Sequence, residues 1–117
     1  MTVARAVSMA MLSLCSQASV AQSVTAKAGN GAMLFHRYCA TCHGETARGD
    51  GVAAKLFDPR PPDLTRSKLS EEYKESIIRL GGREVGRSPG MPPWRDELDD
   101  EQIRDLLGYL RSVKAAR

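Results

Sequence analysis

Two cysteines and a histidine form the run of residues whose types and spacing indicate a specific chemistry. Residues 39–43 are Cys-Ala-Thr-Cys-His, a pattern typical of c-type haem attachment. Two thiols separated by two residues can add to the two vinyl groups of one haem, and the following histidine can bind the iron. A thioredoxin-like dithiol would follow a strand that the sequence does not predict, and a zinc site would need more ligands than His36 adds. We therefore predict Cys39 and Cys42 as haem-binding residues and His43 as an iron ligand.

Residues 1–21 have the pattern of a cleaved signal peptide. Arg5 precedes an uncharged, mostly apolar run over residues 6–15, and Ser19-Val20-Ala21 supplies the small residues of a cleavage site. The apolar run is about half as long as the ~20 residues of a membrane-spanning helix. We predict export to the bacterial periplasm without stable membrane insertion.

The chain has 117 residues, which allows one small domain. We expect a flexible N-terminus over residues 22–28 and the domain over residues 29–117. Removal of Arg5 lowers the formal charge from +3 to +2, a bias too weak to favour nucleic-acid binding. Aromatic residues make up only 5% of the chain, and a domain this short often needs a metal, disulfide or cofactor to complete its core.

Helical patterns predict the elements that position the motif. The best specified helix is C-terminal, where apolar residues share one face: Ile103, Leu106, Leu107, Leu110 and Val113. Asp99 with Gln102 predicts a capping box at its start, and Leu98 with Ile103 a hydrophobic staple.

A second helix is predicted over residues 71–80, with Ser70 as N-cap and Gly81-Gly82 as the stop. Residues 52–57 predict a further short helix. No alternating strand pattern is present, so the predicted fold class is all-α with long loops.

Residues 31–39 and 106–110 resemble the first and last helices of the small monohaem, His/Met-ligated cytochromes c, a class I family with bacterial periplasmic members. The resemblance covers roughly residues 29–114. It implies the cytochrome c fold, with three or more helices and long loops wrapped around one covalently attached haem c. It also assigns residues to the crossing of the two helices: Gly31, Phe35, Leu106 and Tyr109.

Met91 lies in a Pro-rich loop, Pro89-Gly90-Met91-Pro92-Pro93, that is similar to the ligand-bearing loop of this family. The resemblance implies that Met91 is the second iron ligand. Met33 and His36 lie on the helix that leads into the attachment site, which constrains them away from the opposite haem face.

Two further stretches are similar to haem-packing segments. In Pro62-Asp63-Leu64 the resemblance assigns the Pro62 carbonyl to the His43 imidazole and Leu64 to the haem wall, although an ordinary surface turn is the alternative. Trp94 either packs on the haem edge or donates its indole N–H to a propionate, and the alternative is that it belongs to the core. Four arginines are candidate partners of the haem propionates: Arg60, Arg83, Arg87 and Arg95.

These features predict a monomeric single-electron carrier rather than an enzyme, because two protein ligands leave the iron no open position. The alternatives are an electron-transfer subunit dedicated to one periplasmic dehydrogenase or oxidase complex, and a five-coordinate haem protein that binds external ligands. Residues 79–95 hold four arginines against Glu84, a local charge of +3, and residues 96–105 hold six acids against Arg104, a local charge of −5. The basic segment either attracts an acidic redox partner to the exposed haem edge or is simply a solvated face.

Overall fold

The computed structural model describes residues 29–116, so the predicted signal peptide and flexible N-terminus lie outside the described residues. A helix over residues 29–38 leads into the elements α2 (Ala40–His43), η1 (Ala54–Leu56), η2 (Leu64–Arg66), α3 (Glu71–Glu84) and α4 (Asp100–Ala115). Residues 29–116 contain no strand, which confirms the predicted all-α class. None of the helices in this range has the length and apolar content to cross a membrane.

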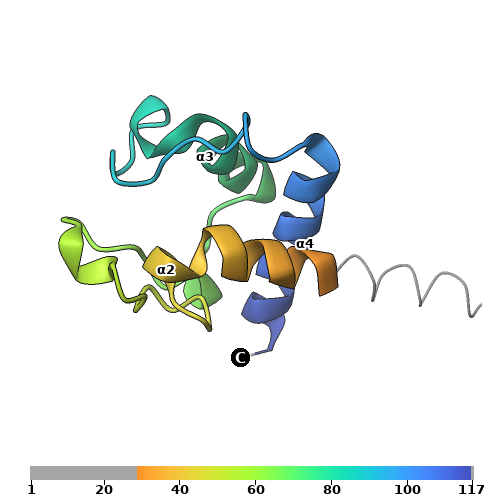
Figure 1. Ribbon diagram of the computed structural model, residues 1–117, viewed down its shortest axis with the longest axis horizontal. Helices are drawn as coiled ribbons and strands as arrows, with labels where there is room; N and C mark the ends of the chain where they lie inside the picture. Colours follow the sequence, from red (N-terminus) through yellow and green to blue (C-terminus); the bar gives the residue numbers. More distant parts are fainter. Residues whose placement is uncertain (1–28, 117) are drawn as a thin grey trace, which may run out of the picture.

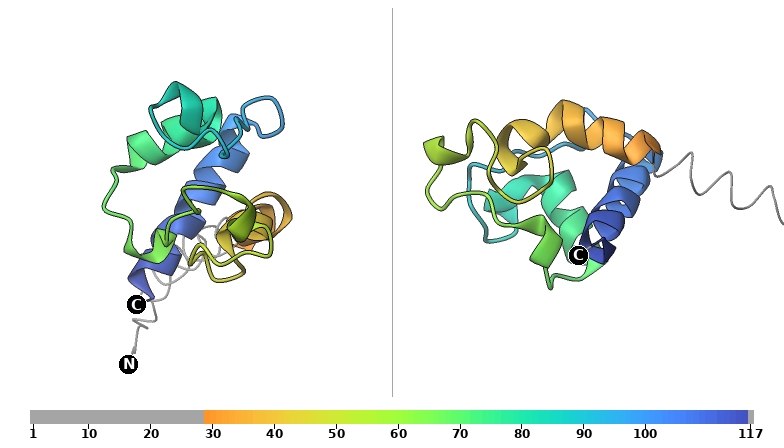
Figure 2. Two further views of the ribbon diagram at one scale, coloured as in Figure 1. Left: turned by 90° about the vertical axis from the view of Figure 1, so that its left-hand side faces the viewer. Right: turned by 90° about the horizontal axis from the view of Figure 1, so that it is seen from below.

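The helix over residues 29–38 crosses α4 closely, as Figures 1 and 2 show from three directions. A β-carbon at Gly31 would overlap the backbone carbonyl oxygen of Asp105 and lie 3.0 Å from the Tyr109 β-carbon. Beside this contact the Phe35 and Tyr109 rings pack with their centroids 5.0 Å apart. The absence of a side chain at residue 31 therefore permits the crossing, as the resemblance implied.

α4 begins as the sequence predicts. The Asp99 carboxylate accepts a hydrogen bond from the Gln102 backbone N–H at 2.8 Å, and the Gln102 side chain accepts one from the Asp99 N–H at 2.9 Å. Leu98 and Ile103 are both buried in the core. The cluster also includes residues from the first helix, α3 and α4: Leu34, Phe35, Ile78, Leu106, Leu107 and Leu110.

α3 starts at the predicted cap, where the Ser70 hydroxyl accepts a hydrogen bond from the Tyr73 N–H. Its helical backbone is interrupted at Gly81, which has φ 79° and ψ 165°. The regular helix therefore ends at the predicted stop, and a short second helical turn follows the kink and continues to Glu84. A left-handed φ at this position is readily adopted only by glycine.

The segment between α2 and α3 is an extended loop carrying the two short 3₁₀ helices. η1 falls within the predicted short helix at residues 52–57 and packs against α2, where the Ala53 N–H donates to the Thr41 carbonyl at 3.0 Å. Figure 1 shows this loop beside α2, and α3 with the following loop on the other side of the molecule.

Candidate haem site

A cavity of about 770 Å³ is lined by residues of the first helix, α2, the loop before η2, α3, the loop after α3, and α4. Its volume is within the range of roughly 300–1,000 Å³ that is usual for ligand pockets. Much of its wall is apolar, including side chains from three helices: Phe35, Ile77, Ile78, Leu106 and Leu110. The described part of the chain therefore surrounds a space suited to a large apolar group.

The predicted attachment residues, Cys39 and Cys42, and the predicted iron ligand His43 all line this cavity. Cys39 ends the first helical segment, and the His43 N–H donates to the Cys39 carbonyl at 2.8 Å. This helical turn brings residues 39, 42 and 43 to one side, because residues three and four positions apart share a helix face. Both cysteines are free thiols, Cys39 buried and Cys42 half-buried.

Burial shifts the pKa values of Cys39 and His43. It raises the pKa of the Cys39 thiol to about 12, with a further contribution from Cys42, so this thiol is neutral at pH 7. Burial also lowers the pKa of His43. The His43 imidazole is therefore neutral at pH 7, which is the form that binds a metal ion.

The His43 Nδ1 atom is buried and has no hydrogen-bond partner within residues 29–116. An unpaired buried polar atom costs about 1–3 kcal/mol. The two thiols, the His43 imidazole and the cavity beside them fit a covalently attached haem. Pro62 is exposed and lines the cavity, but the predicted hydrogen bond from Nδ1 to its carbonyl is not formed in this structure. The role of Pro62 stays a prediction.

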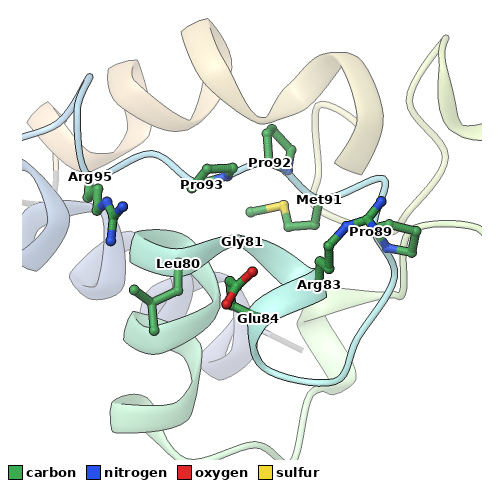
Figure 3. A pocket seen from close by; sticks show the side chains of 9 residues that line it. All are labelled: Leu80, Gly81, Arg83, Glu84, Pro89, Met91, Pro92, Pro93 and Arg95. Atoms are coloured by element: carbon green, nitrogen blue, oxygen red, sulfur yellow. The ribbon is translucent and has the colours of Figure 1, made fainter.

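Met91 lies on the loop that follows α3 and lines the same cavity. The Gly82 N–H donates to the Met91 carbonyl at 2.8 Å, and the Trp94 N–H donates to the Ile78 carbonyl at 2.8 Å. β-carbons at Gly81 and Gly82 would lie 3.0 Å from the Met91 carbonyl oxygen and 3.3 Å from its β-carbon, respectively. Figure 3 shows the Met91 thioether between this loop and the turn at Gly81. The Met91 loop therefore packs directly against the kink of α3 at Gly81 and Gly82.

The other ligand candidates lie elsewhere. Met33 is 67% exposed on the first helix, and His36 is exposed and contacts Glu45 at 2.6 Å. Neither lines the cavity. Of the two methionines and two histidines in residues 29–116, only Met91 and His43 do so, and ligation by Met91 remains a prediction.

Leu64 and Trp94 also line the cavity. Leu64 is the first residue of η2, whose N-cap Asp63 accepts a hydrogen bond from the Thr65 N–H at 3.0 Å. Trp94 packs edge-on against Tyr38 with ring centroids 5.4 Å apart. Trp94 therefore packs against the core and also lines the cavity, so it occupies two of the environments that the sequence left open.

The structure divides the four candidate propionate partners into two pairs. Arg60 and Arg87 line the cavity, whereas Arg83 and Arg95 line a second, smaller hollow of about 540 Å³, here called the outer hollow, which shares Met91 and Pro92 with the cavity (Figure 3). Three more basic residues at the cavity were missed by the sequence reasoning: Arg66, Lys68 and Lys74. No local pattern marks them, because their position depends on how η2 and α3 pack.

The sequence matches the family model described as cytochrome C oxidase, cbb3-type, subunit III over residues 26–110. The chain belongs to this family of cytochrome c domains. Membership implies electron transfer and covalently bound haem c, with which the spacing of Cys39, Cys42 and His43 agrees. It also confirms the resemblance to the cytochromes c.

Individual relatives include both a small protein and much larger ones. The cytochrome c domain is 34% identical to cytochrome c6 of Bryopsis maxima, over 68% of this chain and 84% of that protein. It is 32% identical to the cbb3-type cytochrome c oxidase subunit CcoP of Azospirillum brasilense, over 75% of this chain and 29% of that protein. It is 30% identical to the dehydrogenase subunit of the quinone alcohol dehydrogenase of Komagataeibacter europaeus, over 77% of this chain but only 11% of that protein.

A solved structure shares the fold. A chain of the reducing HAO-like protein complex of Kuenenia stuttgartiensis superimposes with a TM-score of 0.60 at 28% identity, over 72% of this chain and 41% of that one. The cytochrome c domain thus spans a minor part of several of the proteins it matches.

Proposed function

We propose that this domain is a single-electron carrier with one haem c bound through thioethers to Cys39 and Cys42. The observation that carries the proposal is that both thiols, the His43 imidazole and the Met91 loop line one cavity. When bound, the haem supplies a one-electron Fe(III)/Fe(II) couple.

The residues around the cavity have distinct roles in this proposal. His43 offers a neutral imidazole from α2, and Met91 offers a thioether from the loop seated on α3. With both bound, no coordination position is open for a substrate, which favours a carrier over a catalyst. Apolar residues such as Ile78 and Leu106 exclude water and, with the soft thioether, favour the reduced state.

Substitution of Met91 tests the ligand set. We expect Met91→Ala to keep the haem attached, lose the sulfur-to-iron charge-transfer band of the oxidised protein, bind carbon monoxide rapidly when reduced and have a lower midpoint potential. Met33→Ala is the matched control, because Met33 is exposed on the first helix, and it should behave as the wild type. A Met91→Ala protein with an unchanged spectrum would show that another residue is the ligand.

The carrier could act freely or as a subunit of one complex, and relatives of both kinds support the two forms. Cytochrome c6 is covered over 84% of its length, whereas CcoP and the alcohol dehydrogenase subunit are covered over 29% and 11%. We favour the free carrier. Gel filtration and co-purification from the native host distinguish the two, since a stable stoichiometric complex would contradict the free form.

We place the carrier in the periplasm on the basis of the predicted leader. N-terminal sequencing of the purified holoprotein is expected to begin near residue 22, and fractionation should recover it with periplasmic markers. An uncleaved N-terminus in the native host would contradict this placement.

For the redox partner we propose an acidic protein that docks beside the Met91 loop. Arg79 is already paired with Glu75 and Asp100, and Arg87 packs on Tyr73 at the cavity. Arg83 and Arg95 line the outer hollow together with Glu84, and the Arg95 guanidinium lies 4.0 Å from the exposed Asp96 carboxylate (Figure 3). A positive rim speeds the encounter with a negative partner.

Small oxidants of opposite charge test this rim. Stopped-flow oxidation of the reduced protein by ferricyanide should be slower in Arg83→Gln and Arg95→Gln than in the wild type, and oxidation by a cobalt(III) phenanthroline cation should be faster. Arg104→Gln, an exposed change on α4, is the control for net charge. Equal effects of all three substitutions would indicate that only total charge matters.

A further inference from the structure

One stretch of the cavity wall carries basic side chains without matching acids. Lys68, Lys74 and Arg87 line the cavity, as do Arg60 in the loop before η2 and Arg66 in η2. Asp63 is the only acidic lining residue of the cavity within residues 29–116. Asp63 already accepts hydrogen bonds from the Thr65 N–H and hydroxyl and lies 3.6 Å from the Arg66 guanidinium. Basic groups gathered at a largely apolar cavity repel one another unless an anion enters it.

Tyr73 brings Arg87 close to the first turn of α3. The Arg87 guanidinium carbon lies 5.4 Å from the centroid of the Tyr73 ring, and Nε is 3.4 Å from the Tyr73 hydroxyl. The hydroxyl itself donates to the Val85 carbonyl at 2.8 Å, and the Arg87 N–H donates to the Gly82 carbonyl at 2.6 Å. The backbone and the Nε edge of Arg87 are thus fixed, while both terminal NH₂ groups stay free to bind a carboxylate.

Lys68 and Lys74 flank the same turn of α3. Lys74 is adjacent to Tyr73 and shares a face of α3 with Ile77 and Ile78, which line the cavity with it. Lys68 lies two residues before the N-cap Ser70. The first turn of a helix also favours negative charge because its backbone N–H groups point outward there.

The acids of α3 are engaged elsewhere or absent from the cavity wall. Glu71 pairs with Arg111, and Glu75 pairs with Arg79. Glu72 is exposed. Its pKa is lowered mainly by a hydrogen bond with its own backbone and to a smaller extent by one with the Ser70 side chain. Glu84, the last residue of α3, lines the outer hollow. None of these four acids lines the cavity.

We infer that Arg87, with Lys74 and Lys68, binds the propionate carboxylates of the haem. The inference rests on the proposed function, since it concerns how that haem is oriented. Two carboxylates at this end would neutralise the unmatched cations while the apolar macrocycle fills the rest of the cavity. Arg87 is a positioning residue that fixes one propionate in its ionised form.

The pH profile of the midpoint potential tests this role. Ionisation of a propionate lowers the potential as the pH rises, and a neighbouring cation shifts that step to lower pH. In Arg87→Gln and Lys74→Gln holoprotein, spectroelectrochemistry should show the step moved to higher pH and a lower potential above it. Arg87→Lys should restore the position of the step in part, because it keeps the charge but loses the bidentate geometry.

Arg83→Gln is the matched control. It removes an arginine four residues away that lines the outer hollow and not the cavity, so its pH step should stay in place. The inference is overturned if the step is unmoved in both Arg87→Gln and Lys74→Gln, or moves equally in Arg83→Gln. A wild-type protein without covalent haem would instead refute the proposed function, so the two failures are distinguishable.

Discussion

The contact at Gly31 allows a quantitative test of what holds the two terminal helices together. A β-carbon there would overlap the Asp105 carbonyl oxygen, which belongs to the backbone of α4 and cannot rotate away. Gly31→Ala must therefore push the helices apart. Overpacking of this kind costs about 1–3 kcal/mol, against which alanine regains about 0.5–1 kcal/mol of helix propensity.

Gly108 supplies the matched control on α4. A β-carbon at Gly108 meets only the terminal nitrogen of Arg111, at an ordinary contact distance of 3.5 Å. Gly108→Ala should therefore gain the helix propensity without the steric cost and stabilise the domain by about 0.5–1 kcal/mol. The difference between the two variants isolates the steric cost of about 1–3 kcal/mol.

Thermal unfolding of the holoproteins measures this difference. For a domain of this size 1 kcal/mol corresponds to a Tm change of roughly 4–8 °C, so Gly31→Ala should melt at least about 4 °C below Gly108→Ala. Far-UV circular dichroism and the haem absorption band should report the same transition. A Gly31→Ala protein as stable as Gly108→Ala would refute the close crossing of the helices.

Three further changes test elements that position the site. Asp99→Ala removes the capping box of α4 and should cost about 1 kcal/mol in urea unfolding, whereas Glu101→Ala, an exposed position in the same turn, should cost less. Gly81→Ala forces a residue with a side chain to adopt φ 79° and brings its β-carbon to within 2.9 Å of the Pro93 nitrogen. It should therefore loosen the packing of the Met91 loop against α3 and speed carbon monoxide binding to the reduced protein. An unchanged binding rate would contradict this packing role of Gly81. The hydrogen bond from the Thr65 side chain lowers the pKa of Asp63, so its stabilising effect is present above the ordinary value of 3.8 and is lost as the pH falls through the lower folded-state value. The drop in Tm between about pH 5 and about pH 2 should therefore be smaller in Asp63→Asn than in the wild type.

Features that depend on neighbours in the chain were predictable from the sequence. The capping box of α4, the N-cap of α3 and the grouping of Cys39, Cys42 and His43 on one helical turn all follow from short spacings along the chain. The short helix at residues 52–57 was placed correctly but forms a 3₁₀ turn over Ala54–Leu56. The predicted end of the helix at Gly81 is confirmed as a break in the helical backbone, and the short helical turn beyond it was not predicted.

The sequence by itself determined the cofactor chemistry, because two thiols and an imidazole at fixed spacing specify it locally. The tertiary structure decided what surrounds that chemistry. It packs the Met91 loop against the kinked helix α3, where the Gly82 N–H donates to the Met91 carbonyl. It also places Arg87 at the cavity and Arg83 at the outer hollow. These outcomes depend on the packing of segments far apart in the chain, where small changes of helix orientation decide which side chains reach the cavity.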